Sequence, residues 1–250
     1  MRIGLIGIGA IGGYLAKNLK GGLVWVCDTN EEFCKARMKA LNLPSKVRYV
    51  KTPEKGVDLI IEAASQKAVP MLVPALAYAD ALIMSVGALR DEALLKKLRS
   101  SAKKNKRAIY LPSGAIGGLD AIKSAAPAGL SEVTLETRKP PKTLGRDDRN
   151  EMVIFEGSAF EACEKFPQSV NVAATLSLAG IGFEKTRVRV VSDPKTDRNT
   201  HTITAKGTAG DFKFTVANVP SEENPKTSAL AMLAALRAVR ELEGNELRIL

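Results

Sequence analysis

The sequence predicts an α/β protein in which a doubly wound parallel sheet is followed by a second α/β domain with a mixed sheet. Up to residue 111, short apolar runs alternate with segments of helical periodicity, which is the pattern of βαβ units. From residue 112 on, several segments alternate apolar and polar residues, which is typical of strands with one solvated face. The length of 250 residues exceeds that of most single domains, so we expect two.

The first domain is expected over residues 1–111. Its strands are short apolar runs, and its helices carry inward-facing apolar residues at spacings of three and four. The expected strands are 2–6, 23–28, 58–61, 81–86 and 107–111. The expected helices are 11–19, 31–41, 67–78 and 91–104. In helix 31–41 we expect Phe33, Met38 and Leu41 to face inward.

The second domain is expected over residues 112–220, and a closing segment over 221–250. The expected strands are 130–137, 186–191, 200–206 and 211–219, and the expected helices are 158–165 and 171–178. Gly207 and Gly210 lie where a hairpin would join the last two strands. Residues 140–141 are consecutive prolines in a basic loop. The closing segment holds an alanine- and leucine-rich helix, 227–243, which we expect to pack back on the first domain.

Composition and charge exclude several classes of protein. Hydrophobic residues make up 45% of the chain and charged residues 26%, which rules out disordered and fibrous proteins. The uncharged runs 3–16 and 166–183 contain glycines or polar residues, so we expect neither a signal peptide nor a membrane span, and a cytoplasmic location. Despite the net charge of +10, the basic cluster 96–107 has no aromatic residue, so we interpret it as a solvated helix face and expect no nucleic-acid partner. The positive field would still favour an anionic substrate or a dinucleotide.

The three cysteines are Cys27, Cys34 and Cys163. An odd number without C-x-x-C spacing argues against a disulfide framework and against a zinc site. Free cysteine is among the most buried residue types, so we expect three buried or half-buried thiols and no bound metal.

A glycine-rich turn with the sequence GIGAIG occupies residues 7–12, between the first strand and the first helix. In this G-x-G-x-x-G pattern, Gly7 permits a tight turn, Gly9 lets the backbone approach a pyrophosphate, and Gly12 allows close packing of helix on strand. Asp28 ends the second strand 21 residues after Gly7, where a carboxylate can bind the adenosine ribose hydroxyls. These features predict a Rossmann dinucleotide-binding domain. A purely structural strand–turn–helix is the alternative.

Asp28 also bears on the choice of cofactor. A carboxylate at this position repels the 2′-phosphate of NADP, and the next residues, Thr29 and Asn30, offer no cation to hold it. We therefore expect NAD to be preferred. NADP stays possible, because Lys35 and Arg37 follow on the next helix and could reach the ribose.

His201 is the only histidine of the chain. It has the strand parity of Ile203 and Ala205 and so points to the apolar side, where a purely structural histidine is one interpretation. The polar segment 193–199 comes directly before it, so His201 lies near a strand end at which a cleft can open. Imidazole is suited to proton transfer near neutral pH, which makes His201 the candidate catalytic acid–base residue.

Two further turns follow strands at the edge where α/β sheets bind ligands. The turn 62–66 contains small residues, among them Ala64 and Ser65, that would let a dinucleotide lie close. The turn 112–120 is rich in glycine. It either faces the cofactor or is only a tight connection.

Several longer segments are similar to the L-aspartate dehydrogenase family. They are GLIGIGAIGGYLA from Gly4, EAASQKAV from Glu62, PSGAIGGLDAI from Pro112, VIFEGSA from Val153, KFPQSVNVAATLSLAG from Lys165, DRNTHTI from Asp197 and ENPKTSALA from Glu223. The segments are collinear and span essentially the whole chain. The resemblance implies NAD- or NADP-dependent oxidation of L-aspartate to iminoaspartate, with reductive amination of oxaloacetate as the reverse reaction, in the synthesis of quinolinate and NAD.

The same resemblance implies a Rossmann domain and a second, catalytic α/β domain whose sheet helps to form a homodimer. The catalytic histidine of the family falls on His201. The nicotinamide-side contacts fall on Ala115 and Asn171. The phosphate-side contacts fall on the glycine-rich turn, chiefly on Gly9, Ala10 and Ile11.

The two carboxylates of aspartate require cationic or donor-rich anchors. The strongest candidate on physical grounds is Thr227, where the N-terminus of the last expected helix would favour a carboxylate through its amides and its dipole. The other candidates are Ser113, Lys139, Lys142, Asn199, Thr200 and Lys226.

Two other functions stay open. Another two-domain NAD(P)-dependent enzyme of amino-acid metabolism, of the homoserine dehydrogenase or dihydrodipicolinate reductase type, would share the glycine-rich fingerprint. A regulator that senses NAD(H) would need a DNA-binding module or a partner surface. The sequence contains no helix-turn-helix pattern, which disfavours the regulator.

Overall fold

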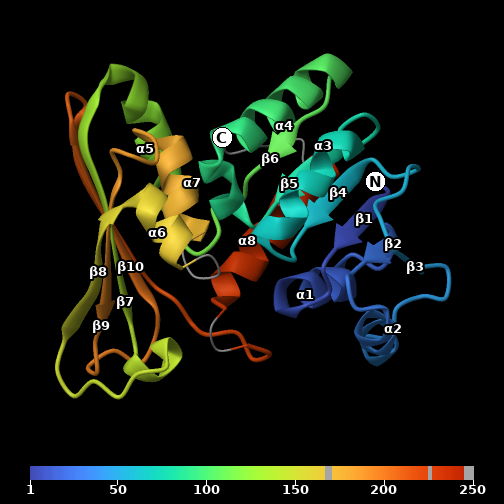
Figure 1. Ribbon diagram of the computed structural model, residues 1–250, viewed down its shortest axis with the longest axis horizontal. Helices are drawn as coiled ribbons and strands as arrows, with labels where there is room; N and C mark the ends of the chain where they lie inside the picture. The colour runs from blue at the N-terminus through green and yellow to red at the C-terminus, as the bar shows by residue number, and fades with distance from the viewer. Residues whose placement is uncertain (167–170, 225–226, 245–250) are drawn as a thin grey trace. The chain divides into compact units, whose positions relative to one another are not determined.

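The computed structural model describes residues 1–166, 171–224 and 227–244. The chain forms two compact units (Figure 1). The first unit comprises Met1–Pro112 and, among the described residues, Ala235–Gly244, and the second runs from Ser113 to Ala234. The second unit is therefore inserted in sequence between the main part of the first unit and its closing helix.

The first unit contains a six-stranded sheet in the order β3-β2-β1-β4-β5-β6. All neighbouring strands run parallel. The chain order reverses between β1 and β4, and sheets of this kind bind ligands in the crevice at the carboxyl ends of those two strands. The strands are β1 (Ile3–Ile6), β2 (Leu23–Cys27), β3 (Arg48–Val50), β4 (Leu59–Glu62), β5 (Asp80–Ile83) and β6 (Ile109–Tyr110).

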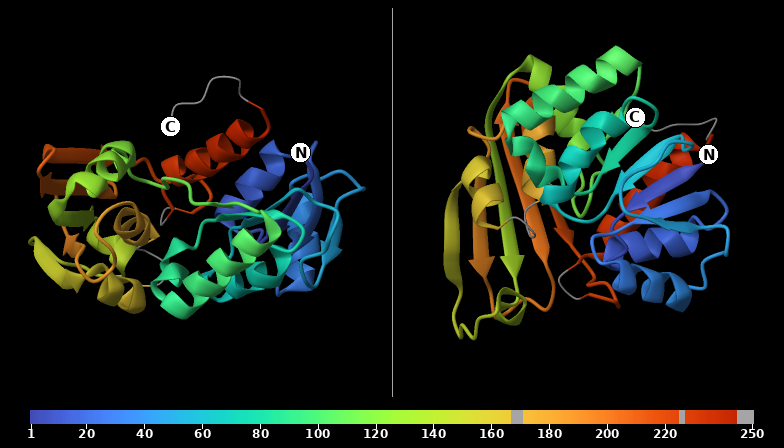
Figure 2. Two further views of the ribbon diagram at one scale, coloured as in Figure 1. Left: turned by 90° about the horizontal axis from the view of Figure 1, so that it is seen from above. Right: turned by 45° about the vertical axis from the view of Figure 1, so that its right-hand side comes forward.

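Helices cover both faces of this sheet (Figure 1). On one face, Leu15 of the first helix packs in a common core with Leu5 of β1 and with Leu236 and Val239 of the closing helix. The ribbons of these two helices lie near each other in both views of Figure 2. The first unit therefore completes its core with the last described helix. The helices and 3-10 turns are α1 (Ala10–Asn18), α2 (Glu31–Ala40), η1 (Gln66–Met71), α3 (Leu72–Ala75), η2 (Val86–Arg90), α4 (Glu92–Asn105) and α8 (Ala229–Leu242).

Three details of the first unit differ from the expectation. Residues 67–78 do not form one helix, because Pro70 and Pro74 lack an amide hydrogen and the segment breaks into η1 and the four-residue α3. The pattern does not predict β3, a three-residue strand at the sheet edge. Phe33 does not face inward but is 48% exposed, whereas Met38 and Leu41 pack against the core as expected.

The second unit contains a five-stranded sheet in the order β11-β10-β7-β9-β8. Strands β7 and β9 run parallel and the other neighbours antiparallel, so the sheet is mixed. The predicted hairpin is confirmed, since β10 and β11 pair along their whole length. The sequence pattern does not predict β8. The strands are β7 (Leu130–Lys139), β8 (Met152–Ser158), β9 (Arg187–Ser192), β10 (Thr200–Gly207) and β11 (Gly210–Ala217).

The two faces of the second sheet differ. Leu135 of β7 and Ile203 of β10 point to one face and are buried, while Glu136 and Thr202 point to the other and are half-buried. The described helices α5, α6 and α7 lie on the buried face (Figure 1). The helices and 3-10 turns of this unit are α5 (Leu119–Ala125), η3 (Ala126–Ala128), η4 (Pro141–Leu144), α6 (Ala159–Lys165) and α7 (Asn171–Ala179).

The two sheets together confirm the predicted fold class, a doubly wound parallel sheet and a second α/β unit with a mixed sheet. None of the helices in the described part of the chain is both long enough and apolar enough to cross a bilayer. None of the three cysteines, all of which the structure describes, forms a disulfide, and all three are buried, as expected. Burial raises the pKa of Cys27 to about 11 and that of Cys34 to about 12, so both thiols are unreactive near neutral pH.

Candidate active site

The glycine-rich turn of the first unit leaves an open approach to the start of α1. Gly7 has φ +88°, a conformation that favours glycine, and a Cβ at Gly12 would lie 2.0 Å from the carbonyl oxygen of Gly7. A Cβ at Gly9 would meet no atom within 4 Å. Gly9 is the N-cap of α1, and no side chain caps this helix and no acidic residue lies in its first turn. The amides of that turn therefore remain donors for an anion.

A pocket of about 480 Å³ lies beside this turn, within the first unit. It brings together five residues predicted to bind the cofactor, namely Gly7, Gly9, Asp28, Ala64 and Ser65. Gly12 is buried beneath the turn, and Ala10 and Ile11 are half-buried in the first turn of α1. The pocket also includes Thr29, Phe33, Lys51 and Lys67, which were not predicted to bind the cofactor.

Asp28 connects the end of β2 to the glycine-rich turn. One carboxylate oxygen, Oδ2, accepts a hydrogen bond from the amide of Ile8 at 3.2 Å, and the other, Oδ1, accepts one from the amide of Asn30 at 3.2 Å. The carboxylate is therefore fixed at the edge of the pocket. This is where the fingerprint requires an acceptor for ribose hydroxyls.

Lys35 and Arg37, which the sequence suggested as cations near the ribose, are not among the residues that line the pocket. Lys35 is 2.6 Å from the carboxylate of Glu31 on the same helix, and the guanidinium of Arg37 lies against Gly13 of α1. Lys51, which follows β3, lines the pocket instead. It was missed because β3 itself is too short to produce a pattern.

Glu62 is a buried carboxylate at the carboxyl end of β4, with 0% exposure. It accepts hydrogen bonds from the amide of Ala64 at 2.8 Å, from the amide of Ser85 at 3.0 Å and from the hydroxyl of Ser85 at 2.9 Å. Burial raises its pKa, although these hydrogen bonds act in the opposite direction. Glu62 thus ties the loop after β4, which lines the pocket, to the loop after β5. An acid at the end of the apolar strand LIIE is the signal that could have identified it.

In the second unit, His201 lies on the buried face of the sheet. It is 5% exposed, and its Nδ1 is 3.0 Å from Oγ1 of Thr137 on the adjacent strand β7. Burial, and then the charge of Lys139, lower the pKa of His201 to about 4. The imidazole is therefore neutral near pH 7. The burial of Ile203 and Ala205 confirms that His201 points to the apolar side.

Lys139 is the last residue of β7 and is only 7% exposed. The alternation along β7 places it on the face of Thr137 and His201, so it belongs to the interior and not to a surface loop. Lys142 is exposed and lies in η4. Of these two anchor candidates, only Lys139 shares the histidine face.

The turn that begins at Ser113 lies over the same buried face. A Cβ at Gly118 would lie 2.4 Å from the ring of Phe214 on β11, and one at Gly114 would lie 3.8 Å from Val172, the second residue of α7. The carbonyl of Ala115 accepts a hydrogen bond from Nδ2 of Asn218 at 3.0 Å. The structure therefore brings Ala115 to the start of α7, whose first residue is Asn171, and to the end of β11.

Two further substrate candidates, Asn199 and Thr200, point to opposite faces of the second sheet. Asn199 is buried and precedes His201 by two residues, on the same face. Thr200 points to the opposite face, where its register partners are Arg138 and Ala217.

Thr227 is not at the N-terminus of a helix, because α8 begins at Ala229. The amide of Thr227 donates to the carbonyl of Asn224 at 2.8 Å, so it is not available to a carboxylate in the way that was expected. Ser228 instead directly precedes the first residue of the helix, Ala229. Lys226 lies outside the described residues.

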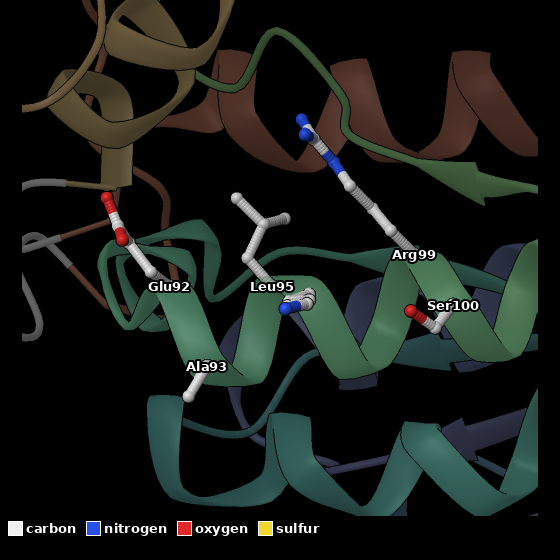
Figure 3. A pocket seen from close by; sticks show the side chains of 6 residues that line it. Glu92, Ala93, Leu95, Arg99 and Ser100 are labelled. Atoms are coloured by element: carbon white, nitrogen blue, oxygen red, sulfur yellow. The ribbon is translucent and has the colours of Figure 1, made fainter.

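A second hollow, of about 540 Å³, lies on the surface of α4. All the residues that line it come from this one helix, and Figure 3 shows Glu92, Leu95 and Arg99 leaving the same side of it. Lys96 and Arg99 belong to the basic cluster and are exposed, which agrees with a solvated helix face. No predicted site residue lies there, and we assign this hollow no ligand.

Comparison with known protein families supports both units. The family described as "Homoserine dehydrogenase, NAD binding domain" matches residues 7–112. The family described as "Aspartate dehydrogenase, C-terminal" matches residues 120–242. The first unit is thus an NAD(P)-binding domain, and its open glycine-rich turn and fixed Asp28 fit such a cofactor.

Curated relatives resemble the chain over its full length. It is 46% identical over 268 residues to the L-aspartate dehydrogenase of Methanosarcina acetivorans, with 97% of each chain covered. It is 40% identical over 262 residues to the L-aspartate dehydrogenase of Methanocaldococcus jannaschii, again with 97% of each covered. The chain belongs to the L-aspartate dehydrogenase family. This confirms the resemblance found in the sequence segments.

A solved structure agrees with this family membership. The aspartate dehydrogenase of Thermotoga maritima matches with a TM-score of 0.83 and 32% identity, covering 100% of this chain and 99% of that one. A dihydrodipicolinate reductase from Paenisporosarcina matches with a TM-score of 0.51 and 14% identity. The second likeness concerns the fold alone, so it does not favour the reductase alternative.

Proposed function

We propose that this chain catalyses the reversible oxidation of L-aspartate to iminoaspartate, with NAD as the preferred oxidant. Membership of the L-aspartate dehydrogenase family supports the reaction. The observation that carries the mechanism is His201, a buried neutral imidazole whose Nδ1 is held by Thr137 at 3.0 Å. The buried polar residues Lys139, Asn199 and Asn218 would surround a small polar substrate.

His201 serves as the base. The amine of aspartate must lose a proton before its lone pair can assist departure of the hydride from C2. With its proton on Nδ1 and donated to Oγ1 of Thr137, the imidazole presents Nε2 as the acceptor; this tautomer is the one that the mechanism requires. Bound NAD(P) supplies the hydride acceptor. In the reverse direction His201 returns the proton to the nitrogen.

The low pKa of His201 in the free enzyme is consistent with this role. Burial and the charge of Lys139 disfavour the imidazolium in the absence of substrate. The two carboxylates of a substrate beside the ring would offset the charge of Lys139 and raise the pKa of His201. Lys139, on the same face, is the residue that we propose as an anchor for a substrate carboxylate.

The preference for NAD rests on Asp28. Its carboxylate is held between the amides of Ile8 and Asn30, so it cannot easily turn away from a 2′-phosphate. Lys51 and Lys67 line the same pocket and offer positive charge that allows weaker use of NADP.

We further propose that the chain forms a homodimer through the face of the second sheet that lies opposite to α5, α6 and α7. That face carries an ion-pair network in which Arg138 contacts Glu136 at 2.7 Å, Glu151 at 2.6 Å and Asp193 at 3.0 Å. Threonines of the adjacent hairpin, Thr202 among them, widen this polar surface. Light scattering coupled to size exclusion should give twice the chain mass, and a monomer would contradict the dimer.

One assay tests the proposed reaction. Absorbance at the reduced-nicotinamide band is followed with L-aspartate, D-aspartate, L-glutamate and homoserine, each with NAD and with NADP. We expect turnover with L-aspartate alone, and faster with NAD. Turnover with homoserine and none with L-aspartate would refute the proposal in favour of the homoserine dehydrogenase type.

A further inference from the structure

Two asparagines beside His201 carry buried oxygens without a hydrogen-bond partner. Within the described residues, three buried side-chain atoms lack a partner, namely Ser192 Oγ, Asn199 Oδ1 and Asn218 Oδ1. Buried polar groups in native proteins are nearly always hydrogen-bonded, so each exception calls for an explanation. Ser192 lies on β9, two strands away from β10 in the sheet, whereas the two asparagines are neighbours.

The backbone places these two asparagines side by side. The amide of Asn218 donates to the carbonyl of Asn199 at 2.8 Å, one pair beyond the last register pair of β10 and β11, Thr200 and Ala217. Asn199 is 6% exposed and Asn218 is 3% exposed. Since side chains alternate along a strand, Asn199 lies on the same face as His201.

The orientation of the Asn218 amide follows from its neighbour. Its Nδ2 donates to the carbonyl of Ala115 at 3.0 Å, and a carbonyl can only accept. The nitrogen is therefore assigned to Ala115, and Oδ1 is the atom that remains to accept a hydrogen bond. Asn199 contributes a second such oxygen on the same buried face.

We propose that Asn199 and Asn218 form an acceptor pair that binds the amino group of the substrate and selects an amino diacid over diacids without the amine. This inference rests on the proposed function. A primary ammonium has three N–H donors, and the pair together with Nε2 of His201 offers three acceptors. A hydroxyl group has one donor and a methylene has none, so either would leave the buried oxygens unsatisfied.

The chemistry of the pair excludes the other parts of the substrate. A carboxylate has no donor and would be repelled by two amide oxygens. The amide group of the nicotinamide ring is the competing donor, because Ala115 is a predicted nicotinamide contact. The test below separates the two occupants.

The principal variant is Asn199→Leu, which removes the acceptor oxygen at similar size and leaves the Asn218–Ala115 bond intact. Three quantities are measured on the full-length enzyme: kcat/KM for L-aspartate, the inhibition constant of succinate, and the affinity for NADH by fluorescence. Succinate is the same diacid without the amine. We expect kcat/KM for L-aspartate to fall about tenfold to a hundredfold, as for a lost hydrogen bond to a charged donor, while the other two quantities stay unchanged.

Two further variants secure the result. Asn218→Ala should produce the same selective loss, and it replaces Asn199→Leu if circular dichroism shows that the latter does not fold. Thr204→Val is the control, since Thr204 lies on the same strand as His201 but is exposed and points to the opposite face, and it should leave all three quantities unchanged.

Three outcomes would overturn the proposal. Equal weakening of L-aspartate and succinate would mean that the pair does not recognise the amine. A selective loss of NADH affinity would assign the pair to the nicotinamide amide. If both asparagine variants keep the wild-type ratio of kcat/KM for L-aspartate to the inhibition constant of succinate, the acceptor pair is refuted and the proposed function is not. If the wild-type enzyme does not turn over L-aspartate, the proposed function itself is refuted.

Discussion

The two units position their functional groups by different physical means. In the first, the candidate site consists largely of backbone: a turn at Gly7, an open N-cap at Gly9 and a carboxylate at the end of the next strand. In the second, it consists of side chains, such as Thr137 and His201, that strand register brings together. A backbone site depends on contiguous residues, whereas a register site depends on residues distant in sequence. Substitutions should therefore affect the two units differently.

The largest expected effect is that of His201→Asn in the second unit. Removal of an acid–base group typically costs about 10² to 10⁴ in rate, so kcat should fall by that factor while NADH affinity, measured by fluorescence, stays the same. This variant separates the two units, because the second unit would lose its acid–base group while the first unit would still bind NADH. Wild-type kcat in this variant would remove His201 from the mechanism.

The second prediction concerns stability in acid. The pKa of His201 is about 4 in the folded chain and 6.5 for the ordinary side chain, so between these pH values the unfolded state binds more protons. As the pH drops from 6.5 to 4, His201 should therefore lower the free energy of unfolding by about 3 kcal/mol, in addition to the contributions of the other titrating groups. Urea denaturation across this range, on the wild type and on His201→Asn, measures the difference. Parallel curves would show that His201 is not buried in its neutral form.

The third prediction concerns Glu62, a buried side chain that supports the backbone site. Glu62→Leu leaves the amide of Ala64 and the buried amide of Ser85 without their acceptor, so the free energy of unfolding should fall by about 2 kcal/mol and KM for NAD should rise. Glu62→Gln, which resembles the protonated acid, is the matched control and should retain most of the affinity. Equal KM values for the wild type and Glu62→Leu would mean that the loop after β4 keeps its shape without the carboxylate.

The smallest expected effect is a change in cofactor preference. Asp28→Ser removes the charge that opposes a 2′-phosphate, so the ratio of kcat/KM for NADP to that for NAD should rise about tenfold, which corresponds to one lost charge contact. Lys51→Ala in the same background should reduce the use of NADP again. Steady-state assays with both cofactors measure the ratio, and an unchanged ratio would show that Asp28 does not face the ribose.

The difference between a site of contiguous backbone and a site that depends on strand register also explains how much the sequence could predict. The turn at Gly7–Gly12, Asp28 and the fold class follow from local patterns and were predicted. Thr137 and Asn218 were not identified, because their positions depend on the register of β7, β10 and β11. Thr200 was predicted as a substrate residue, but side chains alternate along β10, so Thr200 lies on the face opposite to His201.

Other misses have local causes that are hard to read from a pattern. Pro70 and Pro74 divide an expected helix, and the three-residue β3 brings Lys51 to the pocket without a recognisable strand signal. Thr227 was expected to open α8, but the helix begins two residues later. Element boundaries are set by hydrogen bonds that composition does not specify.

The closing helix has a consequence for the way this chain is made. Ala235, Leu236 and Val239 fill the core that Leu5 and Leu15 begin more than two hundred residues earlier. A ribosome delivers those residues only after the entire inserted unit. The nascent first sheet therefore has one apolar face incompletely covered until then, so the nucleotide-binding half completes its core only after the second unit has been synthesised.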